Sequence, residues 1–191
     1  MANPAMSAFK AMLATPEPPE LGPGPRAGVQ SVARVTEMVG SLVETTKLAP
    51  DAGELIRALI LLWHDHLEEA HHIAQSIETA DGSLVHGIMH RREPDYGNAR
   101  YWFHRAGRHR SFVELGRRAA ASLVEKGEDA LRKKLAPQDE WDAVAFVDAC
   151  EEAARAPGRR QRNPLLRELQ RIETETLLEY FSGRRPPARQ D

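Results

Sequence analysis

The sequence predicts an all-α fold, a single-domain bundle of about six or seven helices. Apolar residues recur at steps of three and four through most of the chain, which is the spacing of amphipathic helices. No segment keeps the alternation of apolar and polar residues that marks a strand. Apolar residues make up 41% of the 191 residues, which is enough for one hydrophobic core.

The two ends of the chain are expected to lie outside this bundle. Residues 14–28 contain five prolines together with several glycines. Proline and glycine both disfavour the interior of a helix. We therefore predict that residues 1–27 are largely disordered, that residues 28–183 form the helical domain, and that residues 184–191 form a disordered tail.

The first two predicted helices are separated by Pro50. The first spans residues 29–49, because the residue before a proline disfavours helical geometry. The second begins at a capping box formed by Asp51 and Glu54 and runs to about Thr79. Its apolar residues keep the spacing of three and four without a slip, which predicts one continuous buried seam.

Shorter helices are expected over the rest of the chain. Proline, glycine and capping residues mark their ends. We predict a helix from Ser83 to just before Pro94, an aromatic helix over 99–106 closed by Gly107, a helix from Ser111 that weakens at Gly127 and ends before Pro137, one from Asp139 through Cys150, and a last helix from Asn163 to Gly183.

Charge and composition exclude several classes of function. Lys and Arg total 26 against 28 Asp and Glu, so a net charge of −2 argues against nucleic-acid and anionic-membrane binding. No apolar run approaches 18 residues, and the first residues lack the pattern of a secretory signal. The single Cys150 excludes an internal disulfide and a thiolate-rich metal site. We expect a cytoplasmic protein; a homodimer is left open.

All eight histidines fall within 46 residues, between positions 64 and 109, and the other 145 residues contain none. Helical geometry places several of them, with two carboxylates, on two strips. The strips are His64, Glu68 and His71 on the long helix, and His86, His90 and Glu93 on the next. A short turn makes the two helices antiparallel, which sets His71 level with His90.

Imidazole and carboxylate groups in this arrangement favour a transition-metal site holding Zn, Fe, Mn or Ni. The predicted ligands are His64, Glu68, His71, His86 and His90. Three protein ligands and one open position would activate water, with His64 or Glu68 as general base if it is not a ligand. Two alternatives remain: a metal-free histidine cluster for proton transfer or anion binding, and a solvated face without a function.

The segment 90–105 follows the second strip and combines arginines, carboxylates and aromatic rings, as expected for a substrate pocket. Residues 51–90 carry a net charge of −6 and residues 91–118 a net +5, which partly reflects neutralisation between neighbouring helices. Some arginines are expected to grip an anionic small molecule by two-point contacts. The predicted substrate-binding residues are Arg91, Arg92, Glu93, Asp95, Tyr96, Asn98, Arg100, Tyr101 and Trp102.

Two resemblances accompany these motifs. The pairing of His64-x₃-Glu68 with His86-x₃-His90 resembles the central part of the hemerythrin-like pattern, which implies a di-iron four-helix bundle. The family pattern also has an upstream histidine, which is absent here. It has a later His-x₄-Asp, in place of which this chain has His104-x₄-His109. Residues 88–102 also resemble an IMHRREPDYGNAKYW segment of uncharacterised bacterial and fungal proteins. That resemblance implies no particular reaction.

Together the residues predict a metal-binding helical protein, and the plainest reaction for it is metal-dependent hydrolysis of an anionic small molecule. A non-catalytic module that binds an acidic small molecule or partner through arginine, histidine and aromatic groups is the alternative. The third interpretation is a helical interaction protein whose histidines have no chemical role.

Overall fold

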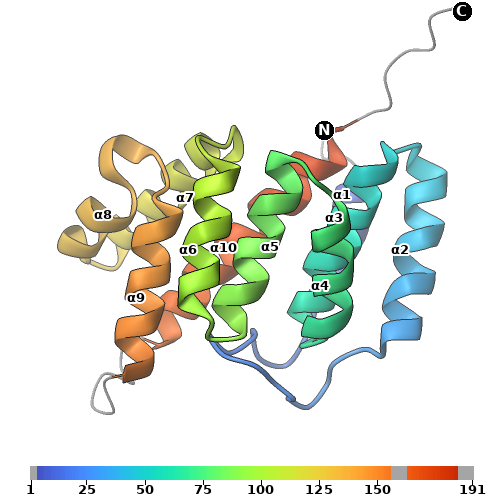
Figure 1. The fold of residues 1–191 in the computed structure, drawn as a ribbon, viewed down its shortest axis with the longest axis horizontal. Coiled ribbons are helices and arrows are strands. Elements are labelled where there is room, and N and C mark those ends of the chain that lie inside the picture. The colour runs from blue at the N-terminus through green and yellow to red at the C-terminus, as the bar shows by residue number, and fades with distance from the viewer. Residues whose placement is uncertain (1–3, 156–162, 185–191) are drawn as a thin grey trace, which may run out of the picture.

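A computed structural model describes residues 4–155 and 163–184 of the chain (Figure 1). Over these residues it contains ten α-helices, one 3-10 helix and no strand. The all-α prediction is therefore confirmed, and the number of helices exceeds the predicted six or seven. The additional helices come from an N-terminal helix and from two predicted helices that are each divided in two.

The helices have the following bounds in chain order. They are α1 (Pro4–Ala11), α2 (Val32–Thr46), α3 (Pro50–Trp63), α4 (Leu67–Ser76), α5 (Ala80–Arg92), α6 (Tyr96–Ala106), α7 (Ser111–Glu125), α8 (Asp129–Leu135), the 3-10 helix η1 (Pro137–Asp139), α9 (Ala143–Arg155) and α10 (Asn163–Ser182).

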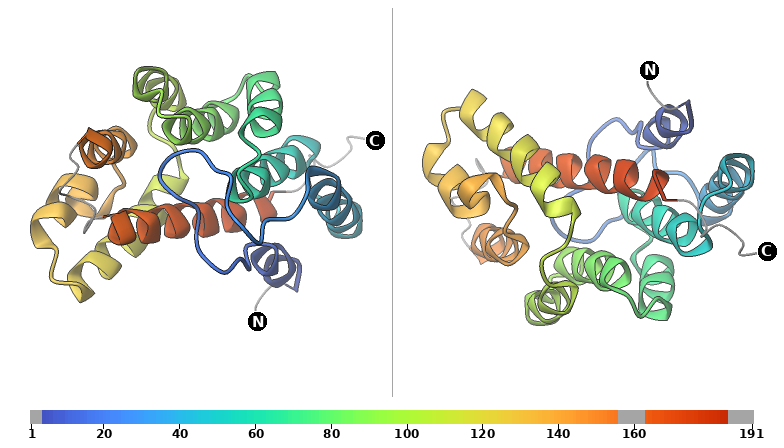
Figure 2. Two further views of the ribbon diagram at one scale, coloured as in Figure 1. Left: turned by 90° about the horizontal axis from the view of Figure 1, so that it is seen from below. Right: turned by 90° about the horizontal axis from the view of Figure 1, so that it is seen from above.

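Helices α3 and α10 form the centre of the fold. From Leu55 to Trp63 all residues of α3 but Arg57 are buried, and Leu169, Leu177 and Phe181 of α10 are fully buried. Figure 2 shows α10 (red) running through the middle of the molecule, with α7 and α3 against it and α4, α5 and α6 gathered on one side. Burial of these apolar side chains is the main force that holds the helices together.

The long helix predicted over residues 51–79 is divided at residues 64–66. Asp65 there adopts a left-handed backbone conformation with φ 66°, which ends α3 and turns the chain into α4. Its carboxylate accepts a hydrogen bond from Arg92 at 2.7 Å and pairs with Arg26 at 3.1 Å. These two distant arginines stabilise the break, although the apolar spacing continues through it. The predicted capping box is also wrong, because Ala49 is the N-cap residue and makes no side-chain cap.

The proline-rich segment expected to be disordered lies against the helical body. Phe9 of α1 is fully buried between α10 and its neighbours, and the following chain crosses the face of α10 (Figure 2). Gln170 donates to the carbonyl of Pro19 at 3.2 Å, and Arg92 donates to that of Gly22 at 3.2 Å. Proline and glycine exclude a helix here, but the carbonyl groups of an extended chain remain free to accept these bonds.

The remaining predicted boundaries are met only in part: α5 begins at Ala80 and not at Ser83, α6 begins at Tyr96 and not at Ala99, and α9 begins at Ala143 and not at Asp139. The expected cap of α7 by Ser111 is also wrong, because Arg110 is the N-cap residue and makes no side-chain cap. Gly107 and Gly127 have positive φ and end α6 and α7, and the last helix begins at Asn163 as expected. The predicted tail beyond residue 184 lies outside the described residues. Among the helices of the described residues, none has the length and apolar character needed to cross a membrane.

Candidate metal centre

The candidate site lies between α4 and α5, which are joined by residues 77–79 and pack side by side. Thr79 caps α5 by accepting a hydrogen bond from the N–H of Gly82 at 3.1 Å. α5 is covered by α3, α4 and α6, so all its residues from Gly82 to Arg92 are buried. Its histidines and arginines are therefore held inside the protein, where each needs a partner.

Three histidines meet in this position. His71 comes from α4, and His86 and His90 come from successive turns of α5. One ring nitrogen of each lies within 4.8 Å of those of the other two. The ring centroids are 4.7 Å apart for His71 and His86, 5.2 Å for His71 and His90, and 4.8 Å for His86 and His90. The prediction that His71 lies level with His90 across the turn agrees with these distances.

Two of these imidazoles are buried, and one of them, His86, makes no hydrogen bond. His86 is 3% exposed and His90 7% exposed. Neither ring nitrogen of His86 has a hydrogen-bond partner, whereas Nδ1 of His90 lies 3.2 Å from the carboxylate of Glu93. Buried polar atoms are nearly always paired in native proteins. A buried imidazole without a partner, with two further imidazoles beside it, is the arrangement expected of metal ligands.

The protonation state of the cluster suits metal binding. Burial, together with the neighbouring His90 and His71, lowers the pKa of His86 to about 4. Burial also lowers the pKa of His90, and His71 adds to the effect, whereas Glu93 opposes it. At neutral pH the His86 imidazole is therefore uncharged, and its lone pair is available to a metal ion.

Trp102 of α6 forms one wall of the site. Its ring stacks on His86 with centroids 3.9 Å apart and an interplanar angle of 22°. Gly87 permits this close packing of α6, because a Cβ atom there would lie 3.1 Å from the ring of Phe103. The stacking fixes the plane of the His86 ring and covers one of its faces.

Glu93 lies at the edge of the cluster. Its carboxylate is exposed and stands 3.2 Å from Nδ1 of His90. A carboxylate beside one nitrogen of a histidine orients the ring and directs the other nitrogen toward a metal. Glu93 is therefore placed to orient the His90 ring. The sequence had predicted a different role for it, in substrate binding.

His64 and Glu68 do not join the three histidines. Nδ1 of His64 accepts a hydrogen bond from the N–H of Gln30 at 3.1 Å, and its Nε2 donates to the carbonyl of Met12 at 2.9 Å. Both nitrogens are used by the N-terminal segment. Glu68 is exposed on the first turn of α4. The break at Asp65 removes the common strip that would have aligned His64 with His71.

The arginines predicted to bind an anion are engaged in ion pairs. Arg91 is fully buried and makes two hydrogen bonds to the carboxylate of Glu173 on α10. Arg92 pairs with Asp65 and also donates to the carbonyl of Leu62 at 2.8 Å. Arg100 pairs with Asp148 and Glu151 of α9. Their charges hold helices together. The guanidinium groups of Arg91 and Arg92 are buried, whereas the Arg100 side chain is 31% exposed.

The remaining predicted substrate residues also have local contacts. Asp95 caps α6 by accepting hydrogen bonds from the backbone N–H and side chain of Asn98. Tyr96 is half-buried, whereas Tyr101 is 52% exposed and packs edge-on against Trp102. Of the segment 90–105, the structure thus brings only His90, Glu93 and Trp102 to the histidine cluster.

One buried polar chain was missed by the sequence analysis. Nδ1 of His109 lies 2.7 Å from the hydroxyl of Ser111, and its Nε2 lies 2.7 Å from the carboxylate of Asp81. His109 thus links Asp81 in the first turn of α5 to Ser111 at the start of α7. Position 81 lies 28 residues from position 109, so no local pattern indicates the contact.

Comparisons of this chain with protein-family models, with curated proteins and with solved structures find no match.

Proposed function

We propose that this protein binds one transition-metal ion through His71, His86 and His90 and uses it in a hydrolytic reaction. The observation that carries the proposal is the meeting of three imidazoles, with one ring nitrogen of each within 4.8 Å of those of the other two, around the buried ring of His86, whose two nitrogens have no hydrogen-bond partner. Leaving such polar atoms unpaired is costly, and one bound cation would satisfy all three rings.

The donor set determines which ions suit the site. Neutral imidazoles favour Zn, Fe, Ni and Cu over Mg or Ca, which prefer oxygen ligands. Three protein ligands leave a coordination position for water, and a divalent metal then lowers the pKa of that water toward neutrality. Hydrolysis is the simplest chemistry for such a site.

The structure gives less support to an anionic substrate. That expectation depended on Arg91, Arg92 and Arg100, and all three have acidic partners in the fold. The same ion pairs remove the argument for a non-catalytic module that grips an acidic ligand through these arginines. The groups around the cluster are instead an aromatic wall, Trp102, and a carboxylate, Glu93.

Metal binding is tested by titrating metal-stripped, untagged protein with Zn²⁺ in a calorimeter. We expect one site per chain, and His86→Ala or His90→Ala should weaken binding by at least ~100-fold, since each loses a ligand. His72→Ala is the matched control, because His72 is an exposed histidine beside His71 on the same helix. The control should bind as the wild type does.

The role of Glu93 and the hydrolytic step need separate measurements. Glu93→Gln should weaken Zn²⁺ binding by about 10-fold, which is typical for loss of a carboxylate that orients a histidine ligand. The loaded protein should hydrolyse p-nitrophenyl acetate faster than the His86→Ala variant. Binding without this difference would contradict the hydrolase proposal. Wild-type protein that takes up no Zn²⁺, Fe²⁺, Mn²⁺ or Ni²⁺ would contradict the metal site itself.

A further inference from the structure

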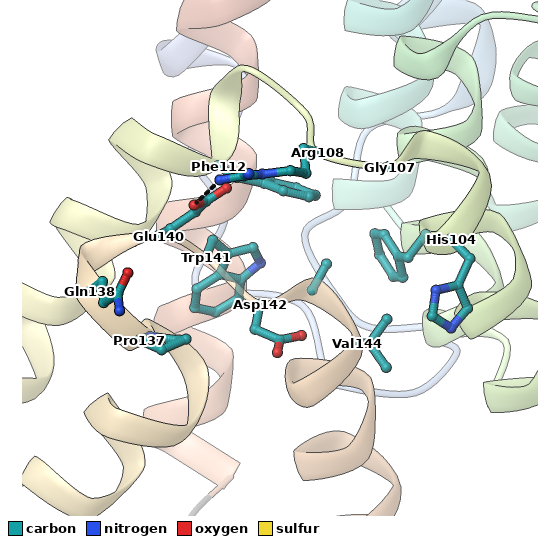
Figure 3. Close-up of a pocket in the computed structure, with 12 residues that line it drawn as sticks. His104, Gly107, Arg108, Phe112, Pro137, Gln138, Glu140, Trp141, Asp142 and Val144 are labelled. Carbon is teal, nitrogen blue, oxygen red and sulfur yellow. Dashed lines mark hydrogen bonds and ion pairs between the residues drawn. The ribbon is translucent and has the colours of Figure 1, made fainter.

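A cavity of about 500 Å³ lies away from the histidine cluster. It is bounded by the end of α6, the start of α7 and the residues that lead into α9 (Figure 3). Phe103, Phe112 and Trp141 give it an aromatic wall, and Val144 adds an aliphatic contact. A cavity of this size, lined by aromatic rings and polar groups in similar measure, is within the range of small-molecule sites.

The indole of Trp141 carries an unsatisfied donor at this cavity. The side chain is 3% exposed, and its Nε1 is buried without a hydrogen-bond partner. Figure 3 shows the nitrogen edge of the ring turned toward the cavity. By contrast, Nε1 of Trp63 donates to the hydroxyl of Thr15 at 3.2 Å. Buried indole N–H groups normally find an acceptor, so the one on Trp141 points to an acceptor on a ligand.

The chain that carries Trp141 is held in a strained conformation. Gln138 and Asp139 both have left-handed backbone geometry, with φ 55° and 59°. The segment rests directly on Gly116 of α7, where a Cβ atom would come within 2.3 Å of the carbonyl oxygen of Asp139. Consecutive non-glycine residues in this region are uncommon and are found preferentially at binding sites.

Asp142 supplies an acceptor to the lining of the same cavity. Its Oδ1 accepts a hydrogen bond from the N–H of Ala145 at 2.8 Å and so caps α9, while Oδ2 has no partner among the described residues. At the mouth, Glu140 pairs with Arg108 at 3.0 Å. The lining thus contains two carboxylates and one guanidinium, so it favours a neutral or cationic ligand over an anion.

We propose that this cavity binds a planar aromatic or heteroaromatic amide. The ring of the ligand packs against Phe112 and Trp141. Its carbonyl oxygen accepts the hydrogen bond from Nε1 of Trp141, and its amide N–H donates to Oδ2 of Asp142. The proposal uses no residue of the histidine cluster, so it stands or fails independently of metal binding.

The test uses benzamide as the probe and the indole N–H signals of the full chain in ¹H–¹⁵N NMR spectra. The chain has three tryptophans, so Trp63 and Trp102 serve as internal controls. We expect a saturable downfield shift of the Trp141 signal alone. Benzoate, which Asp142 repels, should bind at least ~5-fold more weakly than benzamide.

Two variants separate binding from folding. Trp141→Phe keeps an aromatic ring without the donor and should weaken benzamide binding by about 5-fold, which is the effect of one hydrogen bond. Asp142→Asn retains the helix cap and should also weaken binding, whereas Asp129→Asn, an exposed carboxylate on α8, should not. An unmoved Trp141 signal, equal shifts of all three signals, or equal effects of the two Asp→Asn changes would overturn the proposal.

Discussion

Replacing Arg91 by methionine should destabilise the folded protein by about 3–5 kcal/mol. Arg91 is 0% exposed and Glu173 is 1% exposed, and two hydrogen bonds join their charged groups. The guanidinium also lies 4.4 Å from the ring centroid of Phe146. Burial alone lowers the pKa of Arg91, but the charge and hydrogen bonds of Glu173 outweigh it and raise the pKa. Without the arginine, the carboxylate stays buried with no compensating charge.

A double-mutant cycle measures this pair directly. Arg91→Met and Glu173→Leu should each cost several kcal/mol, whereas the double variant should cost about 1–2 kcal/mol, because two apolar side chains can replace a buried pair. The free energy of unfolding is obtained from urea titrations followed by circular dichroism at pH 7. If Arg91→Met costs less than about 1 kcal/mol, or if the two single effects add, the pair does not have the structural role assigned to it. The folded double variant should still bind Zn²⁺.

Two further predictions concern packing and burial. Gly116→Ala should lower the free energy of unfolding by about 1–3 kcal/mol, because the new methyl group overlaps the Asp139 carbonyl. Gly40 on α2 has open space around it, so Gly40→Ala should raise the melting temperature through helix propensity. Equal shifts of the melting temperature in the two variants would contradict the close packing at Gly116. Burial raises the pKa of Cys150 to about 12, so native protein at pH 8 should react with Ellman's reagent at least ~100-fold more slowly than urea-unfolded protein. Since the unfolded thiol ionises first, the stability that Cys150 contributes is present below about pH 9 and is lost as the pH rises toward 12. Comparable reaction rates in the two states would show that the thiol is not buried.

The sequence predicted those features that local patterns determine. Helical spacing identified the all-α class, and Asn163 marked the start of α10. The i, i+4 spacing of His86 and His90 and the short turn before them placed His71 at their level, as the structure has it. Each of these inferences depends on residues close together in the chain.

Features that depend on distant partners could not be predicted in this way. The apolar spacing runs unbroken through Asp65, so only its contacts with Arg92 and Arg26 explain the end of α3 there. Arg91 looked available because its partner, Glu173, lies 82 residues away. The unpaired donor of Trp141 arises from tertiary packing and has no signal in the sequence.

The most direct test of the metal centre is X-ray absorption at the zinc edge, on protein loaded with one equivalent of Zn²⁺ and then desalted. Coordination by His71, His86 and His90 predicts three imidazole nitrogens at about 2.0–2.1 Å, together with one water oxygen in the open position. A sample that loses its zinc on desalting, or a spectrum with oxygen ligands and no imidazole scattering, would contradict the account.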